Sequence, residues 1–170
     1  MPVTPFHFGV GLLCKGGAPA RVSLGAFILS QVLIDLESGY FLFVAREWPV
    51  HRWAHTFALS ALIGLGAGVI ACLGARVVTQ GASDAAWSSE VGLWPAMTGG
   101  LLGGLTHPLL DGLMHADIRP FLPLSEENPL LGLIGLAELH LFCVGAGLTG
   151  LVLLGARRLG REAGDRGTDG

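Results

Sequence analysis

The chain has 170 residues, of which 51% are hydrophobic and only 14% are charged, and its mean hydropathy is +0.61. Soluble domains carry about 25% charged residues, so this composition excludes an ordinary soluble domain and predicts an all-α integral membrane protein. The net charge of −3 is small, and no nucleic-acid partner is expected. The three cysteines form no CxxC pair, which argues against a thiolate zinc site.

Hydropathy predicts four membrane-spanning helices behind one shorter apolar helix. Residues 3–14 are apolar but fall short of the roughly 20 residues that a span requires, so they predict an N-terminal half-helix. We expect a four-helix transmembrane bundle in contact with membrane lipids, forming one domain over residues 1–156 and followed by a flexible polar cytoplasmic tail over 157–170. The spans are expected at 22–45, 51–75, 91–114 and 129–156.

The basic residues predict the orientation of this bundle. With four spans the two termini lie on the same side of the membrane, and that side holds seven of the ten lysines and arginines. Because basic residues are enriched on the cytoplasmic side, both termini are expected in the cytoplasm, with the protein in the inner membrane of the cell. Residues 1–17 lack the basic region of a cleavable signal peptide, so insertion is expected to use the spans themselves.

The most informative stretch is 99–123, where metal-ligand side chains project from an apolar helix. His107, Asp111 and His115 follow one another at intervals of four residues, which predicts that they lie on one helical face. Burying one ionisable group in such a helix costs free energy, and burying three calls for a functional reason. Imidazole and carboxylate without thiolate suit zinc and similar divalent ions.

Further ligand-type residues are expected at the same end of the bundle, away from the cytoplasm. Asp35 lies in the second half of the first span, and His51 and His55 lie at the start of the second. His7 reaches this cluster only if the half-helix runs antiparallel to the first span. Which of His51 and His55 binds the metal is left open by the sequence.

Two arginines are expected on the same side as this cluster. Arg52 follows His51, and Arg119 follows the third span. A guanidinium group pairs well with a phosphate or a carboxylate, so both arginines are candidates to hold such a group of a substrate. His115 is a further candidate, either at the metal or as a residue that orients a ligand.

The ordered series His7, Asp35, His51/His55 and His107-x-x-x-Asp111 resembles the family of membrane-bound metal-dependent hydrolases typified by a LexA-regulated inner-membrane protein. That family is grouped with zinc-dependent phospholipase C and the S1/P1 nucleases. The resemblance covers about residues 4–120. It implies metal ligation by His7, Asp35, His55, His107 and Asp111, and hydrolysis of a phosphoester or lipid-like substrate.

The sequence departs from the family pattern in two places. The soluble enzymes add a later His-x-x-x-Glu pair, whereas the fourth span here offers Glu138-x-His140, two residues that point in different directions on a helix. His51 and His55 are also one residue closer together than the corresponding histidines of the membrane family.

We therefore predict a membrane-embedded hydrolase in which a divalent ion, expected to be zinc, activates water toward a phosphoester or a lipid-like ester. An ion- or proton-coupled transporter and a structural membrane protein with a buried polar core are the alternatives, because intramembrane acids and histidines also mark ion pathways. A haem-binding bundle fits less well, since the acids would not be ligands. The expected metal ligands are His7, Asp35, His51, His55, His107 and Asp111, and the expected catalytic residues are Asp111, His115, Arg52 and Arg119.

Overall fold

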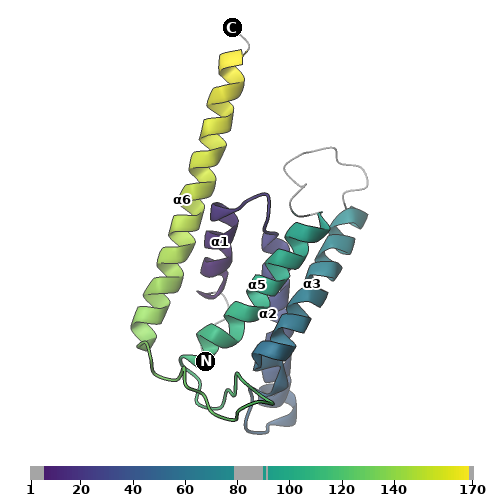
Figure 1. Cartoon of the computed structure of the whole chain (residues 1–170), viewed down its shortest axis with the longest axis vertical. Coiled ribbons are helices and arrows are strands. Elements are labelled where there is room, and N and C mark those ends of the chain that lie inside the picture. The colour runs from purple at the N-terminus through teal and green to yellow at the C-terminus, as the bar shows by residue number, and fades with distance from the viewer. Residues whose placement is uncertain (1–5, 79–89, 91, 169–170) are drawn as a thin grey trace.

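The computed structural model is all-helical (Figure 1) and describes residues 6–78, 90 and 92–168. A π-helical segment, Tyr40–Ala45, prolongs α2, and a 3-10 turn, Trp53–His55, precedes α3. The all-α class expected from the composition is confirmed for the described residues, which contain no strand. Their α-helices are α1 (Phe8–Gly17), α2 (Leu24–Gly39), α3 (Phe57–Val78), α5 (Leu93–Gly112) and α6 (Leu136–Thr168).

Among the described helices, three are long and apolar enough to cross a membrane: Leu24–Ala45, Phe57–Val78 and Leu136–Gly164. They overlap the expected spans 22–45, 51–75 and 129–156. α5 occupies the expected span 91–114 but is not among the three, so the prediction of four spans with a half-helix is not confirmed. The glycines, the proline and the ionisable residues of α5 lower its hydropathy.

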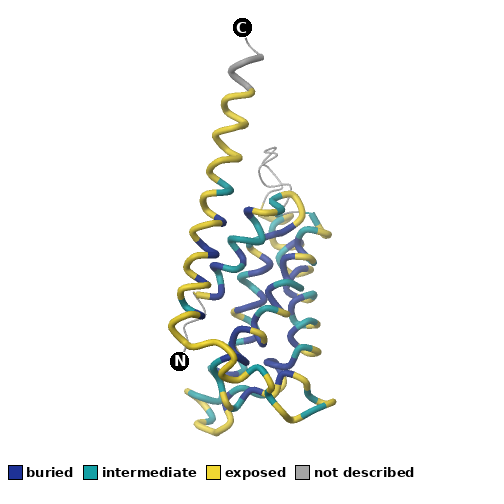
Figure 2. The backbone as a smooth tube through the Cα atoms, turned by 60° about the vertical axis from the view of Figure 1, so that its left-hand side comes forward, coloured by how far each residue is buried: buried dark blue, intermediate teal, exposed yellow. Residues whose placement is uncertain are grey.

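α5 packs against both α2 and α3, and glycines bring the backbones of these helices into contact. A Cβ atom at Gly100 would overlap the backbone of Gly64, and a Cβ atom at Gly103 would overlap α2 at Phe27 and Ser30. Half of the residues of α5 are buried, whereas α6 is largely exposed (Figure 2). This close packing holds the polar side chains of α5 inside the bundle.

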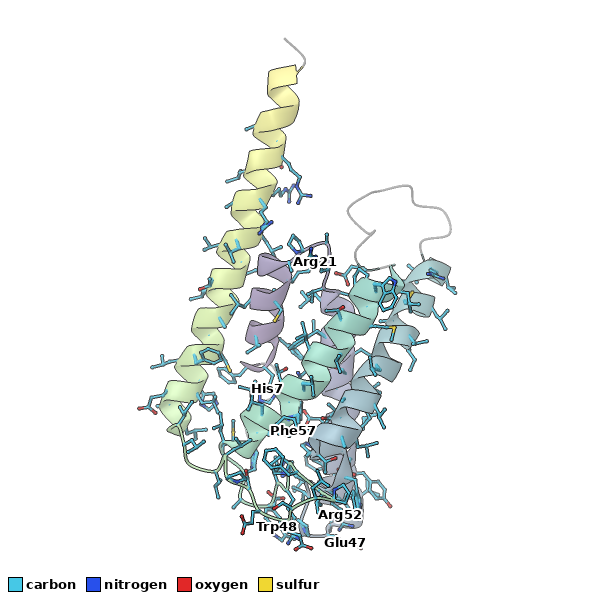
Figure 3. The ribbon with its side chains drawn as sticks, in the orientation of Figure 1. His7, Arg21, Glu47, Trp48, Arg52 and Phe57 are labelled. Carbon is cyan, nitrogen blue, oxygen red and sulfur yellow. The ribbon has the colours of Figure 1, made fainter. Side chains whose placement is uncertain are left out.

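α1 is a short helix that runs antiparallel to α2 and pairs with α6 (Figure 1). Gly9 and Gly150 permit this pairing, because a Cβ atom at either would overlap the backbone of the opposite helix. The half-helix expected at 3–14 is thus found at Phe8–Gly17, and residues 1–5 lie outside the described part. Its direction carries His7 into the middle of the bundle (Figure 3).

α3 begins later than expected. Thr56 has an extended backbone and its Oγ1 accepts a hydrogen bond from the Leu59 N–H at 3.2 Å, which is the arrangement of an N-cap. The helix therefore starts at Phe57 rather than at residue 51. His51 and His55 precede it and do not share a helical turn, so they face different neighbours.

α5 ends earlier than expected, at Gly112. The Asn128 side chain donates from Nδ2 to the carbonyl of Gly112 at 2.9 Å and thereby satisfies a free C=O group at this helix end. His115 lies three residues beyond the end of the helix. The expectation that His107, Asp111 and His115 stack on one helical face is therefore wrong for His115.

α6 begins at Leu136 rather than at residue 129. Gly132 has a φ of 74°, a left-handed conformation that interrupts a helix. At its other end α6 remains helical to Thr168, through most of the segment 157–170 that was expected to be a polar tail. Arg157 anchors the start of that segment by donating to the carbonyl of Gly17 at 3.2 Å. The flexibility and the cytoplasmic location of this segment stay predictions.

Candidate metal centre

Four of the expected metal ligands converge inside the bundle. Each of Asp35, His55, His107 and Asp111 offers one ligand atom, and these atoms all lie within 4.8 Å of one another. They come from α2, from the turn before α3 and from α5. His55 and His107 are completely buried, and Asp111 is 3% exposed. Helix packing thus assembles residues that are up to 76 positions apart in the chain.

The distances within this group match those between ligands of a single ion. Nε2 of His107 lies 3.2 Å from Asp35 Oδ1 and 3.2 Å from Asp111 Oδ2. Nε2 of His55 lies 3.7 Å and 4.0 Å from the same two oxygens. Four ligands at about 2.0–2.2 Å from a tetrahedral zinc ion are about 3.4 Å from one another.

His7 joins the group from the N-terminal end of α1. Its Nε2 lies 3.2 Å from Asp111 Oδ1, and its side chain is almost fully buried. The two oxygens of Asp111 therefore face different histidines, with Oδ1 toward His7 and Oδ2 toward His107 and His55. The condition set by the sequence, an antiparallel half-helix, is met.

Gln31 fixes which nitrogen of His7 and His107 faces the carboxylates. Its Oε1 lies 3.3 Å from Nδ1 of His7 and 2.5 Å from Nδ1 of His107, while its Nε2 donates to the carbonyl of Gly103 at 2.9 Å. The Gly103 carbonyl orients the amide, so the atom between the two histidines is the oxygen, which only accepts. Both Nδ1 atoms therefore carry the proton, and a neutral ring then presents a lone pair at Nε2.

In the neutral rings, the lone pair at Nε2 faces a carboxylate oxygen, which is also an acceptor. The buried atoms His7 Nε2, His55 Nε2, His107 Nε2 and Asp111 Oδ1 make no hydrogen bond. Buried polar atoms without partners cost free energy, and native proteins contain few of them. A divalent cation among Asp35, His55, His107 and Asp111 would give the Nε2 atoms of His55 and His107 a partner, so this donor set fits such an ion, and His7 lies beside it at Asp111 Oδ1.

Glu37 lies beside the third histidine of the group without a hydrogen bond to it. Its Oε2 lies 3.6 Å from Nδ1 of His55 and accepts hydrogen bonds from the backbone N–H groups of Arg52 (3.1 Å) and Ala54 (2.9 Å). Sequence reasoning missed Gln31 as an orienting residue. Gln31 gave one usable signal, because it is a polar residue one helical turn before Asp35 in an apolar span.

A second group of ligand-type residues lies beside the first and consists of His51, His115 and Asp117, whose ligand atoms lie within 4.8 Å of one another. Nδ1 of His51 contacts both Asp117 oxygens, at 2.9 and 3.0 Å. The backbone N–H groups of Val50 and His51 donate to Asp117 Oδ2 at 3.2 Å. Asp117 was not among the expected site residues.

The second group favours neutral histidines. Burial and the nearby His55 lower the pKa of His51, and burial together with His51 lowers the pKa of His115. Burial opposes ionisation of Asp117, but the hydrogen bonds from the His51 ring and from the backbone, together with the charge of His51, outweigh it and keep the pKa of Asp117 below its ordinary value. The structure thus separates the two histidines between which the sequence could not choose: His55 joins the first group and His51 the second.

The structure does not bring Arg52 and Arg119 to the first group. Arg52 donates to Glu47 Oε2 at 2.9 Å, and its guanidinium carbon lies 3.5 Å from the centre of the Phe41 ring. Arg119 donates to Glu126 Oε2 at 2.7 Å. Both arginines line a cavity of about 360 Å³ whose wall does not include the first group. Their role in holding a substrate stays a prediction.

A different cavity, of about 450 Å³, reaches both groups. Its wall has a polar part, which includes Asp35 and Asp111 from the first group and His51 and His115 from the second. The remainder is mainly apolar and includes Phe43 and Trp48, which are 70% and 74% exposed at the end of the bundle. Figure 3 places Trp48 at that end, with Glu47 and Arg52.

Comparison with known proteins identifies no relative of this chain. No protein-family model, no curated protein and no solved structure matches it.

Proposed function

We propose that this chain is an integral membrane metal-dependent hydrolase whose ion is held by His7, Asp35, His55, His107 and Asp111. The observation that carries the proposal is the Gln31 amide between two histidines. It orients the protons of His7 and His107 away from the carboxylates and leaves buried lone pairs facing one another. A purely structural polar core would gain stability by satisfying these atoms within the protein.

The donor set also suits catalysis rather than tight structural binding alone. Nitrogen and oxygen ligands without thiolate are typical of hydrolytic zinc sites. A divalent ion in such a site acidifies a coordinated water and withdraws charge from a phosphoryl or carbonyl oxygen. Gln31 holds the rings of His7 and His107 with Nε2 toward the carboxylates, and Asp35 borders the cavity by which a substrate would enter.

The cavity supports an amphiphilic substrate, a phosphoester or a lipid-like ester. Its polar wall belongs to the metal-ligand groups, and its apolar wall is formed by Leu42, Phe43, Trp48 and Val50. A volume of about 450 Å³ lies within the range of small-molecule sites. A reacting ester would lie at the carboxylates while an apolar tail extends along Phe43 and Trp48 toward the lipid.

We further propose that α5 crosses the membrane as a fourth span, shielded by α2 and α3, in the inner membrane of the cell. Both termini would then be cytoplasmic. Lys15 and Arg21 lie near the end of the bundle at which α1 finishes, and the cavity lies toward the other end (Figure 3). This arrangement supports a site on the side of the membrane away from the cytoplasm.

Metal content tests the proposal first. The protein is purified in detergent, loaded with Zn²⁺, freed of excess ion and analysed for zinc per chain, beside Asp111→Asn and a His140→Asn control. We expect stoichiometric zinc in the parent and in the control, because His140 donates from Nδ1 to the Leu136 carbonyl within α6 and lies outside both groups. Asp111→Asn is expected to lose zinc, since it removes one charged ligand from the centre.

Hydrolysis is then measured with a chromogenic phosphodiester and with a phospholipid in mixed micelles. We expect zinc-dependent turnover of at least one substrate, abolished by Asp111→Asn and retained by His140→Asn. Stoichiometric zinc without turnover of any ester would rule out the proposed hydrolase activity but not the metal site. If the parent chain retains no zinc, the proposed metal centre is ruled out. The cluster would then be interpreted as a buried core of imidazolium–carboxylate ion pairs.

A further inference from the structure

We infer that His51 and His115 form a second divalent-cation site, separate from the first, with Asp117 as the carboxylate that orients His51. The inference rests on the proposed function, because the second ion would lie beside the first and serve the same cavity. The contacts of His51, His115 and Asp117 carry it, and none of these contacts involves Gln31 or Glu37.

His51 has the same arrangement as His107 of the first group. In both cases an oxygen acceptor from the protein bonds Nδ1: Gln31 at His107 and Asp117 at His51. A carboxylate or amide oxygen at one ring nitrogen is the usual way in which proteins direct the other nitrogen to a metal. Asp117 is itself fixed, because its side chain is 3% exposed and accepts from two backbone N–H groups.

His115 supplies the second ligand. Its ring centre lies 4.4 Å from that of His51, with the planes tilted by 34°. Its Nε2 is buried and makes no hydrogen bond, so this nitrogen has the same unmet requirement as the Nε2 atoms of the first group. The early end of α5 at Gly112 turns His115 away from His107 and toward His51.

The position of this second group gives it a use. The 450 Å³ cavity is lined by His51 and His115 and also by Asp35 and Asp111, so a ligand within it reaches both groups. Two cations that flank one site hold the two sides of a transferring phosphoryl group. A phosphoester, which offers several anionic oxygens, is therefore a better match for the paired sites than a carboxylic ester, which offers one carbonyl oxygen.

The test compares metal stoichiometry and release in four proteins: the parent, His115→Asn, Asp117→Asn and the first-site variant His107→Asn. We expect His115→Asn to hold one equivalent of zinc fewer than the parent, and to keep the zinc that His107→Asn loses. Asp117→Asn is expected to weaken the second site about 10–100-fold, the usual effect of removing an orienting carboxylate. Because the second group is less buried than the first, a chelator should remove its ion first.

Each alternative result is decisive. If His115→Asn and Asp117→Asn hold and release zinc as the parent does, the second site does not exist, although the first stands provided that His107→Asn loses zinc. If His115→Asn loses all zinc while circular dichroism shows unchanged helix content, the two groups form one site and the inference is wrong. If the parent binds no zinc, both the second site and the proposed function fail.

Discussion

The two ends of this bundle differ in how the protein surrounds a carboxylate, Glu90 at one end and Asp111 at the other. At the end where α2 begins, Glu90 Oε1 accepts from Lys15 Nζ at 2.7 Å and Oε2 accepts from Ser23 Oγ at 2.5 Å. The backbone N–H groups of Leu24 and Gly25 add bonds at 3.2 and 3.1 Å. At the other end, Asp111 Oδ1 and the Nε2 atoms of His7, His55 and His107 make no hydrogen bond.

The two carboxylates differ in how fully the protein satisfies them. Glu90 neutralises Lys15 and caps the N-terminus of α2, where a negative charge is favourable, so its four partners stabilise the fold directly. The cluster around Asp111 is held by a specific contact from Gln31, yet its inner Nε2 and Oδ1 atoms make no hydrogen bond. Under the proposed function, this difference separates a polar site that stabilises the fold from one that binds a cation.

The largest expected difference between the two ends is the effect of zinc on the free energy of unfolding. With free Zn²⁺ at 100 times its dissociation constant, we expect the free energy of unfolding of the parent to rise by about 3 kcal/mol, because the ion binds only the folded chain. Asp111→Asn is expected to show a smaller rise, because only the second group can then hold an ion. Thermal unfolding in detergent measures both, with Glu126→Gln as an exposed control. Equal stabilisation of parent and Asp111→Asn would place the zinc elsewhere.

Substitution of Gln31 tests whether this residue orients the histidine ligands at the same end of the bundle. Gln31→Leu removes the acceptor that holds Nδ1 of His7 and His107, so the affinity for zinc is expected to fall about 10–100-fold. Gln31→Glu keeps an acceptor at that position and is expected to retain more of the affinity. Chelator competition provides the measurement. An unchanged affinity in Gln31→Leu would mean that the amide does not orient the ligands.

Glu90 is expected to behave in the opposite manner. Glu90→Gln weakens the bonds to Lys15 and Ser23 and is expected to lower the free energy of unfolding by about 1–2 kcal/mol, a modest value because the carboxylate is partly exposed. Zinc affinity should not change. Chemical unfolding and zinc titration of the same variant test the two statements. Loss of zinc on this substitution would show that the ends are coupled.

Acidification gives the smallest effect. Burial opposes ionisation of Glu90, but the hydrogen bonds from Lys15, Ser23 and the backbone outweigh it and lower the pKa of Glu90. Its contribution to stability is therefore fully present above the ordinary glutamate pKa of about 4.3 and is lost as pH falls through the lowered value. The difference in free energy of unfolding between the parent and Glu90→Gln, measured without zinc, should therefore decrease only when the pH falls below about 4.3. A difference independent of pH would contradict the ion pair.

The sequence predicted the helices better than it predicted the neighbours of each candidate site residue. Long apolar segments and the i, i+4 spacing of His107 and Asp111 are local properties, and the structure agrees with them. The neighbours of His51 and His115 depend on where α3 begins and where α5 ends. Those boundaries follow from a Thr56 cap and from a side-chain contact by Asn128, which comes from a distant turn.

The orienting residues could not be found from spacing at all. Gln31 lies 24 residues from His7 and 76 from His107, and Asp117 lies 66 from His51. Their roles arise only when glycines on α5 let the helices approach closely enough for side chains from α1, α2 and α5 to meet. A polar residue in an apolar span indicates that it has a polar partner but does not identify that partner.

The most direct test of the metal centre is X-ray absorption at the zinc edge on the zinc-loaded parent protein. The account predicts nitrogen and oxygen neighbours at about 2.0–2.2 Å, with the outer scattering of imidazole rings and no sulfur neighbour at about 2.3 Å. Sulfur in the first coordination sphere would assign the zinc to Cys14, Cys72 or Cys143 and would contradict the site. A spectrum of hydrated zinc alone would equally contradict it.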